Sequence, residues 1–274
     1  TCALPISSAC SELSTHWVHD TDAVASALVR TVVKLGGGDW HFLTADYAFG
    51  IDIEKRASSL LESLGGRVMG ATRTPLASPD YAPYLLGAVN SRAKTIGLAL
   101  VGGNLSNALK QAAQLRISAS TQLVAMAANI MDIHDAGLES AQGLIVADAF
   151  YWDLNDETRA WSRRFYEQHN AMPNANHASV YSAVYHYLKA VAAAGTDDGP
   201  SVMRAMQSMP VDDFYARNGR IRADGRMVHD LYVFQVKSPG ESKGPWDYYT
   251  LKAVVPGDQA FQPLSASTCR LVTR

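Results

Sequence analysis

Five short apolar segments alternate with segments of helical period between residues 39 and 149, and this alternation constrains the fold more than any other feature. The apolar segments are nearly continuous in Val, Ile, Leu and Ala, whereas the segments between them place apolar residues at helical spacing. Such a pattern is typical of parallel strands buried on both faces by helices. We therefore predict an α/β fold with parallel strands at 40–44, 67–72, 95–101, 122–127 and 143–149.

Polar or aromatic clusters follow several of these predicted strands. Tyr47 comes after the first, Gly102, Gly103 and Asn104 after the third, and residues 150–152 after the fifth. In an open parallel sheet, ligands bind beyond the carboxyl ends of the strands. Because none of these ends carries an evident nucleophile, the clusters indicate binding of a small molecule rather than catalysis.

Three consecutive aromatic residues, Phe150, Tyr151 and Trp152, stand directly after the last parallel strand. Ring faces at a strand end favour stacking against a ligand in a cleft. The alternative is that the three rings pack in the core.

Sequence motifs for catalysis, nucleotides and metals are absent. The chain contains neither a P-loop nor a GxGxxG motif, and it lacks GxSxG and HExxH. No cluster of cysteines or carboxylates accompanies His16 and His19, so we interpret them as structural. The acidic residues of 153–157 have the pattern of a helix start, where carboxylates cap exposed amides. We expect no enzyme activity, no metal and no cofactor.

The composition excludes two classes of partner. The 274 residues have 47% apolar composition and a net charge of −2, with a pI near 6.4. This charge gives no basic surface for nucleic acid, and no apolar run approaches the roughly 20 residues of a membrane span. Beyond residue 152 the pattern predicts helices at 155–169, 176–194 and 200–208, and then strands that include a hairpin around a 238–244 loop.

The first six residues, TCALPI, match the translation of a common sequencing adapter, although a native loop is the alternative. We therefore expect an artefact there and a gene that begins further upstream, with its signal peptide lost. Setting Cys2 aside leaves Cys10 and Cys269, which could pair in an oxidising compartment. Two buried free thiols remain the alternative.

The chain resembles the type I periplasmic solute-binding proteins of ABC transporters, in the leucine/isoleucine/valine-binding group. The resemblance runs from about Ser8 to the C-terminus and rests on several segments together: FLTADYAFG, GLALVGGNLSNALKQAA, AQGLIVADAFYWDLND, VYSAVYHYLKA and DLYVFQVK. It implies two doubly wound α/β lobes, joined by three crossover strands, that close on a ligand.

The resemblance also assigns site residues. Tyr47 matches the family's aromatic position against the ligand, and Asn104, with Gly102 and Gly103, lies in the loop that meets the ligand from the second lobe. Where amino-acid-binding members place a carboxylate for the ligand's ammonium group, only Asp132 is available here. An aromatic or amphipathic carboxylate is therefore at least as good a candidate ligand as a plain α-amino acid.

One departure from the family is an absence: the family's first hundred or so residues, which supply the opening strands of one lobe, have no counterpart here. We expect residues 17–149 and 213–274 to form one mostly complete lobe. Residues 150–212 should form a mostly helical remnant of the other lobe. Residues 1–16 should contain the adapter-like stretch and the segment that enters the hinge. The apolar helix positions Val180, Val184 and Leu188 should then be exposed.

The predicted function is the periplasmic binding component of an ABC importer, which delivers a small organic solute to the membrane permease. The full-length protein is expected to be a monomer. A ligand-sensing domain of a receptor or regulator on the same fold is the alternative, and an α/β enzyme with an unrecognised site is a weaker one.

Overall fold

The computed structural model describes residues 9–272, so the adapter-like stretch 1–6 lies outside the described residues. The chain divides into two compact units. Unit 2 contains Val24–Asp148 and Tyr232–Val254, and unit 1 contains the chain up to Ala23, Ala149–Leu231 and the chain from Val255.

Unit 2 is built on a seven-stranded sheet with the order β2-β1-β3-β4-β5-β8-β9. Neighbours among the first five strands are parallel, and β8 runs antiparallel to β5. The strands are β1 (Asp39–Ala45), β2 (Arg67–Thr74), β3 (Thr95–Ala99), β4 (Gln122–Ala125), β5 (Ile145–Asp148), β8 (Leu231–Val236) and β9 (Tyr249–Val255). The five predicted parallel strands are all present, and this is the mainly parallel α/β fold expected.

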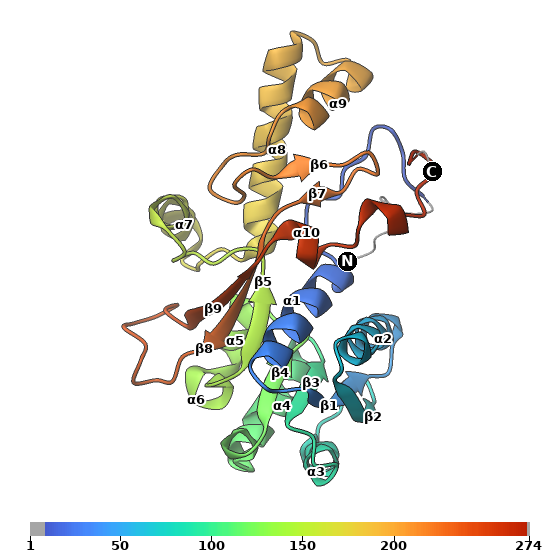
Figure 1. Ribbon diagram of the computed structural model, residues 1–274. Coiled ribbons are helices and arrows are strands. Elements are labelled where there is room, and N and C mark those ends of the chain that lie inside the picture. The colour runs from blue at the N-terminus through green and yellow to red at the C-terminus, as the bar shows by residue number, and fades with distance from the viewer. Residues whose placement is uncertain (1–8, 273–274) are drawn as a thin grey trace. The chain divides into compact units, whose positions relative to one another are not determined.

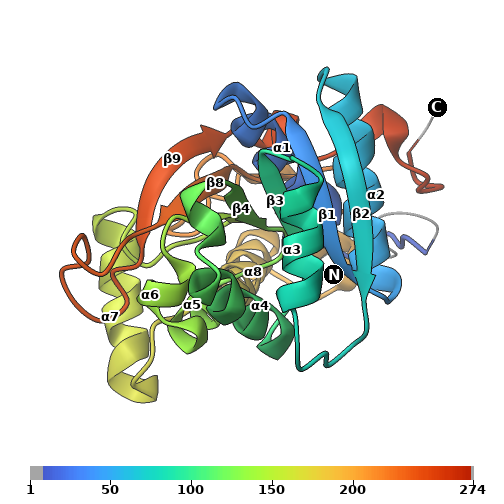
Figure 2. The ribbon, with the colours of Figure 1, turned by 90° about the horizontal axis from the view of Figure 1, so that it is seen from below.

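Helices cover both faces of this sheet (Figures 1 and 2). One face carries α3, α4, α5 and α6, while α2 and most of α1 cover the other (Figure 2). Their bounds are α1 (Thr21–Lys34), α2 (Ala48–Ser63), α3 (Ala82–Asn90), α4 (Gly103–Gln114), α5 (Ile130–Ala136) and α6 (Leu138–Ala141), and η2 (Ile117–Ala119) precedes β4. Because both faces are covered, β1 and β3 are buried almost throughout, as their continuous apolar sequences predict.

Unit 1 is mainly helical. It contains α7 (Asp156–His169), α8 (Ala175–Ala194), α9 (Gly199–Ser208), α10 (Gly257–Ala260) and η3 (Leu264–Ala266), and the antiparallel pair β6 (Arg220–Ile221) and β7 (Met227–Val228). Asn155 and Asn174 cap α7 and α8 through their side chains, so the acidic residues 156–157 begin a helix as predicted. Its core is an aromatic cluster in which Trp161 stacks on Phe214 at a centroid distance of 4.4 Å.

The C-terminal region differs from the expected lobe assignment. The break at Asp148/Ala149 lies close to the expected one, but only Tyr232–Val254 returns to unit 2. Residues 213–231 and those from Val255 belong to unit 1, because β6 packs near α9 and the Gly257 amide donates to Asp230 Oδ1 at 3.0 Å. The chain passes between the units after Ala23, Asp148, Leu231 and Val254, and the first of these passages lies inside α1 rather than in a crossover strand.

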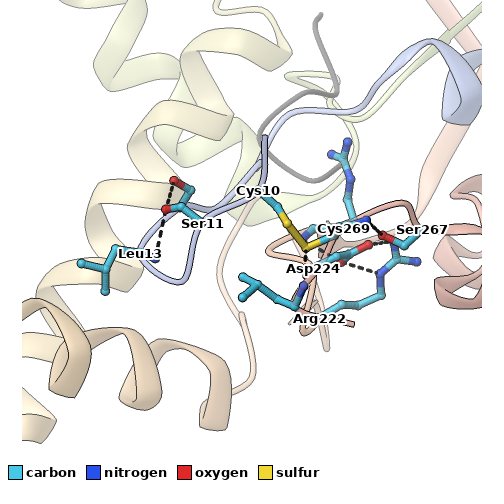
Figure 3. Close-up of a disulfide and its surroundings, with 10 residues drawn as sticks. Cys10, Ser11, Leu13, Arg222, Asp224, Ser267 and Cys269 are labelled. Carbon is cyan, nitrogen blue, oxygen red and sulfur yellow. Dashed lines mark hydrogen bonds and ion pairs between the residues drawn. A yellow bond between two sulfur atoms is a disulfide. The ribbon is translucent and has the colours of Figure 1, made fainter. Parts of the chain in front are cut away.

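A disulfide joins Cys10 to Cys269 within unit 1, the pairing expected from the cysteine count (Figure 3). Their Cα atoms are 5.6 Å apart, and both residues are buried. Beside the bond, Arg222 forms an ion pair with the buried carboxylate of Asp224 (Figure 3). The bond therefore ties the start of the described chain to its C-terminal segment.

Candidate ligand-binding site

The order of the strands in unit 2 creates a topological switch point between β1 and β3. From β1 the chain crosses through α2 to β2 on one side, and from β2 it returns through α3 to β3 on the other side of β1. Thr44 of β1 is paired with Ala99 of β3, so the two strands end next to each other. Ligands of open α/β sheets bind in the crevice that such a reversal opens at the carboxyl ends.

Tyr47 lies at this switch point, directly after β1. It is the N-cap residue of α2 and has extended backbone angles, and its side chain makes no capping hydrogen bond. The half-buried ring lies 5.9 Å from that of Phe49. Burial raises the pKa of the Tyr47 hydroxyl, so the phenol remains neutral at physiological pH and presents an uncharged ring with one polar end.

The α2 helix begins close to the sheet because residue 50 is glycine. A Cβ atom on Gly50 would lie 2.5 Å from the Ala45 carbonyl oxygen and 3.3 Å from that of Ala99. The first turn of α2 therefore touches the ends of both β1 and β3. Any side chain at this position would displace Tyr47 from the switch point.

The loop after β3 provides the second wall. Gly102 is the N-cap residue of α4 with φ +54° and ψ −134°, a conformation that is essentially restricted to glycine. Gly102 and Gly103 are exposed, Asn104 is half-buried, and no side chain caps α4. The first amides of α2 and α4 thus lack side-chain acceptors, and uncapped helix N-termini attract anionic groups.

Asp132 links two of the loops at this edge. Its Oδ2 accepts hydrogen bonds from the Asn129 amide at 2.9 Å and from Asn129 Nδ2 at 2.8 Å, and it also accepts one from the Gly102 amide. Burial raises the pKa of the Asp132 carboxyl, and the bonds from Asn129 and Gly102 oppose this shift. The carboxylate expected to meet a ligand's ammonium group is therefore engaged in holding the β3–α4 and β4–α5 turns together.

Two features of this edge escaped the sequence analysis. The segment after β4 forms the helix α5, capped by Asn129 and Asp132, which was not predicted; the N-x-x-D spacing is the signal that could have predicted it. The second feature is a set of hydrogen bonds that links α2, the helix capped by Tyr47, to β1 and β2. Glu54 of α2 accepts hydrogen bonds from Thr44 of β1 and from Arg73 of β2, one of them from Arg73 Nη2 at 2.9 Å.

The aromatic residues after β5 belong to unit 1 and behave differently from one another. Phe150 is only 2% exposed and packs edge-on against Trp161 and Phe214 in the core cluster. Phe150 therefore packs in the core of unit 1, which was the alternative to contact with a ligand. Its ring fills part of an interior that consists largely of aromatic side chains. Tyr151 is also buried, and Trp152, 5.8 Å from it, is partly buried against the same core cluster. The structure does not bring these rings together with Tyr47, Asn104 and Asp132 within one unit.

The two histidines at close spacing, His16 and His19, lie beside a buried ion pair. Within residues 9–272 no group of three or more potential metal ligands comes together. His16 and His19 flank the ion pair between Arg226 and Asp20, and burial lowers the pKa of each imidazole to about 4. Over the same residues no helix has the length and apolar composition to cross a membrane.

Residues 3–244 match the family model described as "Periplasmic binding protein". The chain belongs to this family. A comparison with curated proteins finds no match. Among solved structures, this periplasmic binding protein is similar to one from Burkholderia mallei, with 42% identity and a TM-score of 0.88 over 98% of this chain and 72% of that one.

Two further solved structures extend the comparison. A branched chain amino acid ABC transporter periplasmic ligand-binding protein from Burkholderia xenovorans LB400 is 32% identical, with a TM-score of 0.95 over 99% of this chain and 73% of that one. An ABC transporter solute-binding protein from R. palustris, solved in complex with benzoate, shares the fold at 15% identity and a TM-score of 0.80, over 97% of this chain and 71% of that one. Membership of the family implies a solute-binding role and an extracytoplasmic location for this periplasmic binding protein.

Proposed function

We propose that this protein is the solute-binding component of an ABC importer, and that it delivers a small amphipathic carboxylate to a membrane permease. The observation that carries the proposal is the β1/β3 switch point, where Tyr47 and two uncapped helix N-termini meet. This arrangement offers donors and a ring face but no nucleophile. It is suited to holding a solute and releasing it unchanged.

The two kinds of group at the switch point fit two ends of one ligand. The first turns of α2 and α4 carry amides that can donate to carboxylate oxygens, and Asn104 adds a side-chain amide. The rings of Tyr47 and Phe49 provide an apolar surface of the size of an aromatic or branched aliphatic group. A few placed polar groups on a mainly apolar wall are typical of small-molecule sites.

Asp132 favours an acid without an ammonium group. An α-amino acid needs an anionic partner for its ammonium group, but the Asp132 carboxylate already accepts hydrogen bonds from the Asn129 and Gly102 amides. We therefore propose aromatic acids of the benzoate type ahead of leucine, in line with the benzoate complex of the R. palustris relative.

Thermal unfolding of the protein in the presence of candidate solutes tests this proposal. A ligand present at a hundredfold excess over its dissociation constant stabilises the folded state by about 2.7 kcal/mol. We expect benzoate or a substituted benzoate to give such a shift and leucine to give a smaller one. A larger shift with leucine would overturn the ligand class, and the absence of a shift with any acid or amino acid would overturn the site.

Matched variants locate the ligand. Tyr47→Ala and Asn104→Ala should each reduce affinity by roughly tenfold or more, because each removes a side chain proposed to contact the ligand. Tyr166→Ala, at an exposed tyrosine of α7, is the control and should bind as the wild type does. If Tyr166→Ala and Tyr47→Ala lose affinity equally, the effect is not specific to the switch point.

A further inference from the structure

The sheet of unit 2 opens between β4 and β5 at its amino edge, the edge opposite the switch point. Gln122, the first residue of β4, is paired with β3, but β4 pairs with β5 two residues further along, through Val124 and Ile145. The turn before β5 follows β8 instead, because the Gly143 amide donates to the Val236 carbonyl oxygen at 2.9 Å. The two parts of the sheet therefore separate towards the amino ends of β4 and β5.

The side chain of Gln122 bridges this opening. Its Nε2 donates to the carbonyl oxygens of Gly143 at 2.8 Å and of Leu123 at 2.9 Å. Gln235 of β8 directs its own Nε2 to the same Gly143 oxygen at 3.4 Å. Side-chain amides thus satisfy backbone carbonyls that strand pairing would otherwise satisfy, and they give the opening a polar lining.

A crevice of about 630 Å³, which we call the amino-edge crevice, lies at this opening and is lined by residues of unit 2 alone. Its volume is within the roughly 300–1,000 Å³ of small-molecule sites. Hydroxyls and amides dominate its lining: Ser118, Thr121, Gln122, Gln142, Gln235 and Thr250. Among the described residues that line it none is aromatic, so the crevice differs in chemistry from the switch point with its rings.

The charged residues of the amino-edge crevice have both signs. Three of them are bonded to neighbours: Lys237 to Asp247, Lys252 to Gln235 and Glu241 to Ser238. The other two, Arg116 and Glu139, form no ion pair within residues 9–272. Because Lys237 and Asp247 neutralise each other, two bases and two acids remain, and the crevice presents no net charge to a ligand.

We propose that the amino-edge crevice is a second ligand site of unit 2, and that it binds a small hydrophilic zwitterion such as a polar amino acid. The planar guanidinium of Arg116 matches the geometry of a carboxylate. Glu139 is an acceptor for an ammonium group, and the amides and hydroxyls of the lining can donate to and accept from polar substituents. A dianion would meet the two acids Glu139 and Glu241, and an aromatic acid would find no ring face.

An NMR titration of the isotope-labelled full chain tests the proposal, with L-glutamine as the probe. We expect chemical shift changes in the amides of residues 116–122, 139–143 and 235–241, whereas residues 45–50 and 102–106 around the switch point should not respond. Saturating benzoate should leave the titration unchanged. The result is therefore independent of which solute binds at the switch point.

Matched arginine variants make the test specific. Arg116→Gly should weaken L-glutamine binding by about tenfold or more, since a hydrogen bond to a charged group contributes that much. The backbone should tolerate the change, because Arg116 has φ +54°, a conformation that suits glycine. Arg92→Gly is the control: Arg92 is also exposed in unit 2, at φ +60°, but lies outside the crevice. Glu139→Gln should weaken binding by a factor similar to that of Arg116→Gly.

The contrary outcomes can be told apart. If succinate, which has two carboxylates and no ammonium group, binds as tightly as L-glutamine, the crevice is a general anion site and the ligand class is wrong. If L-glutamine shifts the amides around the switch point and benzoate displaces it, the amino acid binds at the solute site and the crevice is not a second one. Equal losses in Arg116→Gly and Arg92→Gly, or no response to L-glutamine, would also overturn the proposal.

Discussion

The two units are stabilised by different kinds of interaction. Unit 2 buries a parallel sheet between two layers of helices, and its largest buried side chains include Trp40, Phe42 and Leu43 of β1. Unit 1 has only two short strands within its described residues, and it relies on an aromatic cluster, the disulfide and a buried ion pair between Arg226 and Asp20. A sheet with both faces covered needs few specific links, whereas a set of helices without such a sheet depends on them.

Arg226 illustrates this dependence. The guanidinium is 1% exposed, donates to the carbonyl oxygens of Val18 and His16, and forms an ion pair with Asp20. It also lies 5.0 Å from the Phe261 ring. One side chain therefore joins three stretches of sequence, around residues 18, 226 and 261.

The largest expected effect is the loss of the disulfide. Replacing Cys10 and Cys269 by serine should destabilise unit 1 by about 5 kcal/mol, because the bond restricts a very long loop in the unfolded chain. Hydrogen exchange should accelerate throughout α7–α9 and much less in β1–β5. Equal acceleration in both units would show that they unfold as one body.

Arg226→Met should be nearly as damaging. The change keeps an apolar stem but leaves the Asp20 carboxylate buried without its charge partner, and breaking a buried pair costs about 3–5 kcal/mol. Denaturant unfolding followed by hydrogen exchange measures the loss in unit 1. The control is Arg217→Met, an exposed arginine paired with Glu157, for which we expect no measurable change.

Acid should weaken unit 1 before unit 2. Burial lowers the pKa of His19 and His229 to about 4, against 6.5 in the unfolded chain. Between these values the unfolded state binds more protons, so the stability that these groups give is complete above pH 6.5 and is lost as the pH falls towards 4. At pH 5 each histidine should cost about 2 kcal/mol.

Urea titrations at pH 7 and pH 5 check this dependence, with the two units followed separately by hydrogen exchange. His229→Gln should flatten the pH dependence of unit 1. The same pH dependence of stability in both units, or a stability of unit 1 that increases towards acid pH, would contradict the role given to the buried histidines.

The smallest expected effect comes from a matched pair of valines. Val233→Ala in β8 of unit 2 removes a fully buried side chain and should cost about 2 kcal/mol. Val184→Ala in α8 of unit 1 removes one that is 53% exposed and should change stability by less than about 0.5 kcal/mol. If Val184→Ala is as costly as Val233→Ala, the Val184 side chain is packed against other residues in solution.

The sequence predicted the parts of the molecule that depend on local pattern. All five parallel strands and the main helices appear close to their expected positions, because burial on both faces makes a strand such as β3 apolar throughout. The exposure of Val180, Val184 and Leu188 is confirmed as well. The expected site residues Tyr47, Gly102, Asn104 and Asp132 all lie in or beside the loops at the carboxyl edge of one sheet.

What escaped prediction depends on contacts between distant residues. The C-terminal segment joins unit 1 through Gly257, where a Cβ atom would lie 2.7 Å from Val228 Cγ1, and through Cys269. No local periodicity records such a contact. Phe150 has the same ambiguity, because a ring after a buried strand has the same sequence signature whether it faces a ligand or Trp161.

The disulfide has a consequence for the order of events during biogenesis. Its two cysteines are separated by 259 positions, so in a chain that is exported N-terminus first, Cys10 crosses the membrane long before its partner is available. During that interval its thiol is exposed to oxidants and to the thiols of other proteins. Correct pairing must therefore wait until secretion is nearly finished, and the yield of mature protein should depend on a thiol–disulfide isomerase that can reverse an early mispairing.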